Sequence, residues 1–175
     1  STTQYVNPRK IYITQVTTAS GDLVRDPSKW VKTLYYYCIT RLHLSNVPYT
    51  YLLDENGIIY QGNTGGVGAN PELREIDGAI VIGYLSNTSS LSTRSSESLF
   101  QVVDELSENW GISELEVVNM YINEEEGKLS SISTEISSGD FRNAVKEVFK
   151  DWEGYSEEKL PYKVKIEEVV YEDEV

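Results

Sequence analysis

The stretch YTYLLDENGIIYQG, residues 49–62, places two short apolar runs on either side of the turn sequence Asp54-Glu55-Asn56-Gly57. Asp, Asn and Gly are typical of tight turns between antiparallel strands, because they accept the positive φ angles that such turns require. The stretch therefore predicts a β-hairpin. A glycine-rich loop, residues 62–68, leads from it towards AIVIGYL, residues 79–85, an unbroken apolar run typical of a buried central strand.

Outside the hairpin, strand-like and helix-like segments alternate along the chain. Residues 10–18 are β-branched and aromatic and predict a strand, and residues 117–122 predict a shorter one. Asp26-Pro27 is typical of a helix start, and apolar spacing predicts helices over 27–44, over 93–110 and from 140 onward. The side chains expected on their buried faces are Trp30, Leu34, Tyr37 and Leu44, then Leu99, Val103, Leu106 and Trp110, then Phe141, Val145, Val148 and Trp152.

This alternation predicts a single α/β domain. The last segment, residues 162–175, alternates and then turns acidic, which is typical either of an edge strand or of a tail that binds a partner. The acidic run Glu124–Glu126 predicts a solvated turn.

The composition excludes several classes of protein. The 175 residues include 28 Asp and Glu against 15 Lys and Arg, a formal net charge of −13, which argues against binding to nucleic acid or to an anionic membrane. No apolar run approaches the ~18 residues of a membrane span, and the N-terminal residues lack the pattern of a secretory leader. We therefore expect a soluble mature chain, and a cytoplasmic, phage-particle or processed secreted location stays open.

Metal ligands and nucleophile motifs are scarce. The only histidine and the only cysteine, His43 and Cys38, are expected on one helix five positions apart, about 140° apart around its axis, so they cannot share a metal there. The loop GNTGGVG lacks the lysine of a phosphate-binding P-loop, and no G-x-S-x-G motif is present. We expect no cofactor and no bound metal.

The hairpin stretch resembles the Y-H-F-L-I-D-x-x-G-x-I-Y-x-G segment of zinc-dependent N-acetylmuramoyl-L-alanine amidases, which peptidoglycan recognition proteins and amidase-type phage lysozymes share. Four further segments resemble family segments in the same order: residues 68–70, 78–85, 108–112 and 134–141. The resemblance implies a central mixed β-sheet flanked by helices. It assigns an amidase-like domain to residues 1–153 and leaves residues 154–175 as a C-terminal extension.

The resemblance does not extend to the zinc site. Family members hold zinc with two histidines and a cysteine or aspartate, and these positions fall at Thr14 (or Gln15), Met120 and Ser137. None of these is a usual zinc ligand. Without the metal, neither water activation nor carbonyl polarisation is available, so the sequence predicts a pseudoenzyme. Tyr49 matches the family tyrosine near the zinc.

Three hypotheses of function follow. The favoured one is a catalytically inactive amidase fold reused as a structural or protein-interaction module, in a phage for example, because the acidic surface, the run Tyr35-Tyr36-Tyr37 and the tail suit a protein partner or self-assembly. The alternative is a non-catalytic module that binds peptidoglycan or a muropeptide in the retained groove. A residual amidase and a metal-free enzyme are less favoured. Carboxylates for the latter are Asp54, Glu72, Glu75 and Asp77, and residues expected to line the groove are Tyr49, Tyr51, Gly68, Asn70 and Tyr121.

Overall fold

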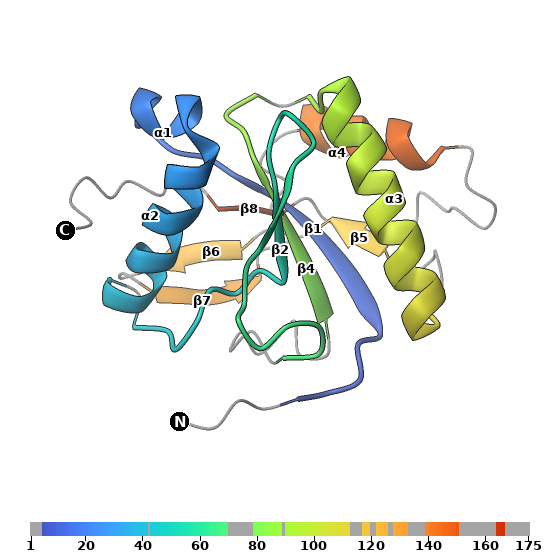
Figure 1. Ribbon diagram of the computed structural model, residues 1–175, viewed down its shortest axis with the longest axis horizontal. Coiled ribbons are helices and arrows are strands. Elements are labelled where there is room, and N and C mark those ends of the chain that lie inside the picture. The colour runs from blue at the N-terminus through green and yellow to red at the C-terminus, as the bar shows by residue number, and fades with distance from the viewer. Residues whose placement is uncertain are drawn as a thin grey trace.

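The computed structural model is a three-layer arrangement, with one central sheet between two groups of helices (Figure 1). It describes residues 5–41, 43–69, 79–88, 90–112, 117–119, 122–125, 128–132, 139–150 and 164–166. The helices are α1 (Gly21–Arg25), α2 (Pro27–Thr40), α3 (Thr93–Trp110) and α4 (Gly139–Phe149). α1 and α2 lie on one side of the sheet, and α3 and α4 on the other.

The central sheet is mixed. Its strands are β1 (Lys10–Val16), β2 (Tyr51–Leu53), β3 (Ile59–Gln61), β4 (Ala79–Leu85), β5 (Val117–Asn119) and β8 (Val164–Ile166). They follow the order β3-β2-β4-β1-β5, with β8 also paired to β1, and only β2 and β3 run antiparallel. β6 (Ile122–Glu125) and β7 (Lys128–Ile132) form a separate antiparallel pair. The predicted α/β fold with a central mixed sheet is confirmed.

Alternation along β1 divides the core into two halves. Tyr12 and Val16 pack with Trp30 and Leu34 of α2, whereas Ile11 and Ile13 belong to the half that contains α3 and α4. β4 is buried on both faces, which explains why its sequence is an uninterrupted apolar run.

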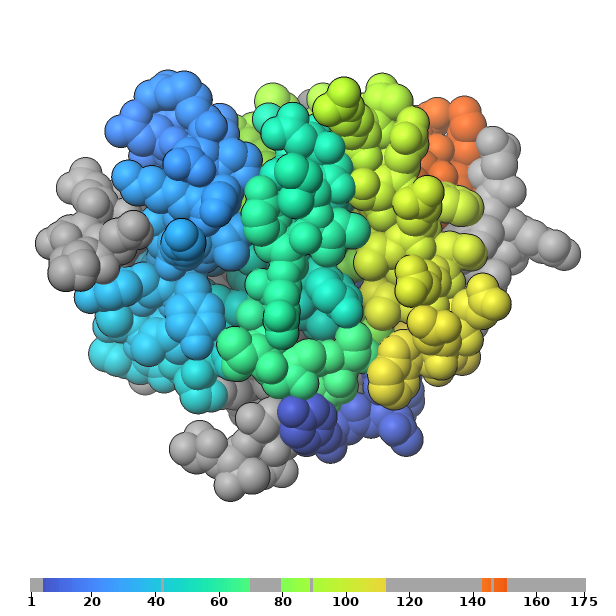
Figure 2. Space-filling view, in the orientation of Figure 1, coloured from blue at the N-terminus to red at the C-terminus, as the bar shows by residue number. Residues whose placement is uncertain are grey.

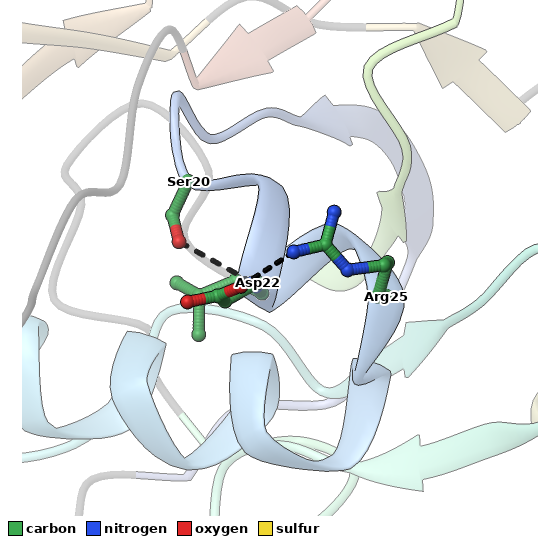
Figure 3. Close-up of polar contacts among 4 residues, drawn as sticks. Ser20, Asp22 and Arg25 are labelled. Carbon is green, nitrogen blue, oxygen red and sulfur yellow. Dashed lines mark hydrogen bonds and ion pairs between the residues drawn. The ribbon is translucent and has the colours of Figure 1, made fainter.

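The helix starts follow local sequence rules. The Ser20 hydroxyl accepts a hydrogen bond from the Leu23 amide and caps α1, and Asp22 forms an ion pair with Arg25 on the same helix (Figure 3). Asp26 and Ser92 cap α2 and α3 in the same way. The short helix α1 was missed by sequence analysis, because five residues carry too little periodicity.

The predicted end of the first helix is wrong. α2 ends at Thr40 rather than Leu44, because the chain turns at His43, whose φ is +57°, and the Leu44 amide donates to the Cys38 carbonyl. A left-handed residue after the last turn ends a helix. His43 and Cys38 therefore do not share a helix, and His43 is exposed whereas Cys38 is buried.

Three other predictions need correction. Trp110 is 46% exposed, because it is the last residue of α3 and Ile112 fills the core beside it. The predicted strand 117–122 is divided between β5 and β6. Glu124 and Glu125 lie in β6 rather than in a turn.

The C-terminal extension contributes β8, which pairs in parallel with the end of β1. The division of the chain at residue 154, and the choice between an edge strand and a partner-binding tail for residues 154–175, stay predictions. Trp152 lies outside the described residues, as does the side chain of Phe141. Among the described helices, none combines the length and the apolar character needed to cross a membrane.

Candidate functional site

The hairpin turn is organised by one buried carboxylate. Asp54 Oδ1 accepts hydrogen bonds from the backbone amides of Asn56 and Ile58, and its Oδ2 accepts one from the Tyr60 hydroxyl at 2.7 Å. Asp54 is 1% exposed. Asp54 was a candidate carboxylate for a metal-free enzyme. In the structure both of its oxygens accept hydrogen bonds within the hairpin.

The Tyr60 phenol is harder to ionise than an ordinary tyrosine. Burial, the hydrogen bond to Asp54 and the negative charges of Asp54 and Asp26 raise its pKa to about 12. The folded chain therefore favours the protonated phenol more strongly than the unfolded chain does.

This pKa predicts a loss of stability at alkaline pH. The stabilisation is fully present below the pKa of an unfolded tyrosine, about 10, and is lost as the pH rises towards about 12. The free energy of unfolding, measured against pH for the natural chain and for Tyr60→Phe, should differ by a constant amount up to about pH 10 and by less above it. A difference that stays constant to pH 12 would contradict the assignment.

The hairpin is also fastened to the start of α3. The Ser92 hydroxyl donates to the Glu55 carbonyl, and the Ser98 hydroxyl donates to the Gly57 carbonyl. Gly57 has a φ of +83°, and a Cβ there would lie 2.8 Å from the Arg94 carbonyl oxygen. The predicted turn glycine is therefore required both by its conformation and by the helix beside it.

The sheet face beneath α2 is buried at Thr14, the first position at which the resemblance predicts a zinc ligand. Leu52, Gly83 and Thr14 are neighbours across β2, β4 and β1, and the Tyr49 ring lies against Gly83, since a Cβ there would be 2.9 Å from Tyr49 Cδ1. Thr14 and Tyr49 are fully buried. Tyr49, predicted to line a groove, is thus a core residue in this structure, and Tyr51 beside it is half-buried.

The first predicted zinc-ligand position offers no ligand to solvent. The Thr14 hydroxyl donates to the Gln15 carbonyl at 3.4 Å. Gln15, the alternative position, donates its Nε2 to the carbonyls of Ser86 and Thr88. Met120 and Ser137, the other two ligand positions, lie outside the described residues, as do Asn70, Glu72, Glu75, Asp77 and Tyr121.

No group of three or more His, Cys, Asp or Glu side chains arranged to hold a metal is present in the part of the chain that the structure describes.

An open groove lies between α2 and the hairpin strand β3. It has a volume of about 310 Å³, and its lining residues are Val31, Lys32 and Tyr35 of α2 and Gln61, Gly62 and Thr64 of β3 and the loop after it. Lys32 is the one charged residue among them, and Tyr35 is 38% exposed. Figure 2 shows α2 and the hairpin next to each other on this face of the molecule.

The glycine-rich loop that borders the groove is held by hydrogen bonds. The Asn63 amide donates to the Tyr49 carbonyl, Asn63 Nδ2 donates to the Val47 carbonyl, and the Asn46 side chain donates to the Thr64 hydroxyl. Gly68 is buried at the far end of this loop and does not line the groove. These hydrogen bonds hold the first residues of the loop in place as one wall of the groove.

Part of this groove lies in segments that the sequence singled out. Tyr35 belongs to the run Tyr35-Tyr36-Tyr37, and Gly62 and Thr64 belong to the glycine-rich loop, residues 62–68. Lys32 and Gln61 are ordinary surface residue types, and only the packing of α2 beside β3 brings them together.

The sequence matches no protein-family model and no curated protein, but the fold has clear structural neighbours. Bumblebee PGRP-SA superimposes with a TM-score of 0.63 at 11% identity, over 89% of this chain and 87% of that chain. Apis mellifera PGRP-SA gives 0.62 at 15% identity, over 89% and 88%. Drosophila peptidoglycan recognition protein SD gives 0.57 at 18% identity, over 90% and 87%.

These likenesses establish the architecture. The chain has the fold of the peptidoglycan recognition proteins, as the resemblance of its hairpin segment predicted. At these levels of identity the likeness concerns the fold alone, and function has to be argued from the residues of the site.

Proposed function

We propose that this chain is a non-catalytic binding module that recognises a peptidoglycan fragment in the groove between α2 and the hairpin. The observation that carries the proposal is the contrast between two surfaces of α2. Where α2 covers the middle of the sheet, Thr14 and Tyr49 are fully buried. Where α2 lies beside the edge strand β3, an open groove remains.

The loss of catalysis follows from the residues at the family's ligand positions. Zinc amidases need a metal-bound water that can reach the scissile carbonyl. Thr14 is a poor zinc ligand, and it is fully buried away from solvent. The residue types at Met120 and Ser137 support the same conclusion.

The groove has the side chains that a glycopeptide needs. The Tyr35 ring gives a flat apolar surface for a sugar ring or a methyl group, and the Lys32 ammonium can pair with a stem-peptide carboxylate. Thr64 and Gln61 add polar groups for amides. The structural neighbours that are named for peptidoglycan recognition support this choice of first ligand.

The net charge of −13 opposes this ligand at long range. Peptidoglycan fragments carry carboxylates, so approach is slowed by repulsion, and screening by salt weakens that repulsion. We therefore expect binding to strengthen between low and moderate ionic strength.

Titration with a muramyl pentapeptide tests the proposal. Lys32→Ala and Tyr35→Ala should each weaken binding by roughly fivefold, the effect of losing a contact worth about 1 kcal/mol. Lys29→Ala is the matched control, because Lys29 is an exposed lysine of α2 that does not line the groove. Equal binding by all three variants and the natural chain would place the ligand elsewhere, and no saturable binding at any ionic strength would reject the proposal.

A further inference from the structure

β3 forms one edge of the central sheet. Among the described residues its single partner strand is β2. The Asp54 amide donates to the Ile58 carbonyl, and the Gly62 amide donates to the Thr50 carbonyl, so Ile58 and Gly62 are bonded towards β2. Because backbone groups alternate in direction along a strand, the N–H and C=O groups of Ile59 and Gln61 are directed away from the sheet.

β3 has few of the features that block strand pairing at a sheet edge. Natural edge strands are blocked by short length, charged residues, proline or a bulge, and β3, which reads Ile-Tyr-Gln, has only the short length. Ile58 and Ile59 are 52% and 38% exposed, so an apolar surface adjoins the outward-directed backbone groups. Such an edge fits an extended segment that pairs with its backbone and covers the two isoleucines.

The charge of the molecule determines which segment fits. A second copy would bring another net charge of −13 to this edge, and the two copies would repel each other. Glu55 is exposed in the turn before β3, and Asp26 lies close enough for its charge to act on Tyr60 of β3. Lys32 on α2 is the opposing charge at the neighbouring groove. The balance favours a basic partner.

We propose that β3 is a docking edge for a basic, extended segment of a partner protein, which adds to the sheet as a further strand. The partner's backbone pairs with Ile59 and Gln61, and its apolar side chains cover Ile58 and Ile59. Its Lys or Arg side chains lie near the exposed Glu55. Gln61 belongs to both sites, but this function depends on the backbone of β3, whereas muropeptide recognition depends on the side chains of Lys32 and Tyr35.

Selection from a displayed library of random heptapeptides on the immobilised full chain tests the proposal. Enriched peptides should combine β-branched residues with Lys or Arg, and their binding should weaken as ionic strength rises. Gln61→Pro should weaken their binding by about tenfold or more, because proline removes an outward N–H and blocks the approach of a strand. No hydrogen bond to β2 is lost in this variant.

Two further variants make the result decisive. Gln61→Thr is the matched control, because it changes the side chain and keeps the amide, and it should bind as the natural chain does. Ile59→Lys keeps every backbone group and should weaken binding by repelling a basic segment, which covers the case in which Gln61→Pro fails to fold. Failure to enrich peptides, enrichment of acidic peptides, or equal binding by Ile59→Lys would overturn the proposal. Lys32→Ala should not weaken peptide binding, since it removes a positive charge beside β3, whereas it should weaken muropeptide binding; this difference separates the two proposals.

Discussion

Replacing Gly62 with alanine should lower the free energy of unfolding by about 3 kcal/mol or more, at the upper end of what overpacking costs. A Cβ on Gly62 would lie 2.1 Å from the Tyr49 carbonyl oxygen and 2.9 Å from the Tyr49 carbonyl carbon. Both contacts are with backbone, which cannot move aside as the end of a flexible side chain can. The substitution therefore forces apart the segment before β2 and the end of the hairpin.

Gly66→Ala is the matched control for this prediction. Gly66 belongs to the same loop and has a φ of +78°, but nothing lies within 4 Å of a Cβ placed there. Its substitution carries the strain of the left-handed conformation alone, about 1 kcal/mol. Urea denaturation of the two variants separates the terms, and a Gly62→Ala variant no less stable than Gly66→Ala would show that the close approach to Tyr49 does not exist in solution.

Replacing Asp54 with alanine should have the second large effect, a loss of about 2–4 kcal/mol. The substitution leaves the amides of Asn56 and Ile58 and the hydroxyl of Tyr60 without their acceptor. These hydrogen bonds are part-buried, so donors that lose their charged acceptor bear part of their desolvation cost. Thermal or urea unfolding measures the loss.

Asp54→Asn and Tyr60→Phe divide that effect into its parts. Asparagine keeps one oxygen for the two backbone amides, so this variant should lose much less than Asp54→Ala. Combined with Tyr60→Phe in a double-mutant cycle, the two variants should show a coupling energy, because the side chains contact each other. Simple additivity would contradict the hydrogen bond, and an Asp54→Ala variant of natural stability would remove Asp54 from its role in the turn.

Much of the fold could be predicted from local sequence. The hairpin, the buried strand at 79–85 and the capped helices depend on turn chemistry, apolar periodicity and capping residues, all of which act over a few positions. The errors lie at segment ends. The chain adopts a left-handed conformation at His43, just after α2, which the residue type alone does not predict. Trp110 is exposed because Ile112 fills the core beside it.

The site was harder to predict than the fold. Tyr49 was expected in a groove and is buried against Gly83, because the closeness of β2 and β4 decides what lies over the glycine. The groove beside β3 depends on α2 packing against a strand some thirty positions away in sequence, as Lys32 and Gln61 illustrate. No spacing rule along one segment contains that information. The expected phage origin stays a prediction.

Thr14 and Tyr49 are fully buried beneath α2, and the Tyr49 ring lies against Gly83. The proposed loss of catalysis depends on this burial and on the residue types at the family's ligand positions. The open groove beside β3 combines the aromatic ring of Tyr35 with the polar side chains of Lys32, Gln61 and Thr64, a composition suited to binding. Both features support the proposal of a module that binds without cutting.

Co-sedimentation with intact peptidoglycan sacculi tests this account most directly. The experiment is carried out with and without added Zn²⁺, and the supernatant is analysed for released peptides. The account predicts saturable pelleting that strengthens from low to moderate salt, weakens in Tyr35→Ala and persists in Lys29→Ala, with no peptide released at either zinc condition. Release of peptides in the presence of Zn²⁺ would contradict the loss of catalysis. The absence of pelleting at every salt concentration would contradict peptidoglycan recognition.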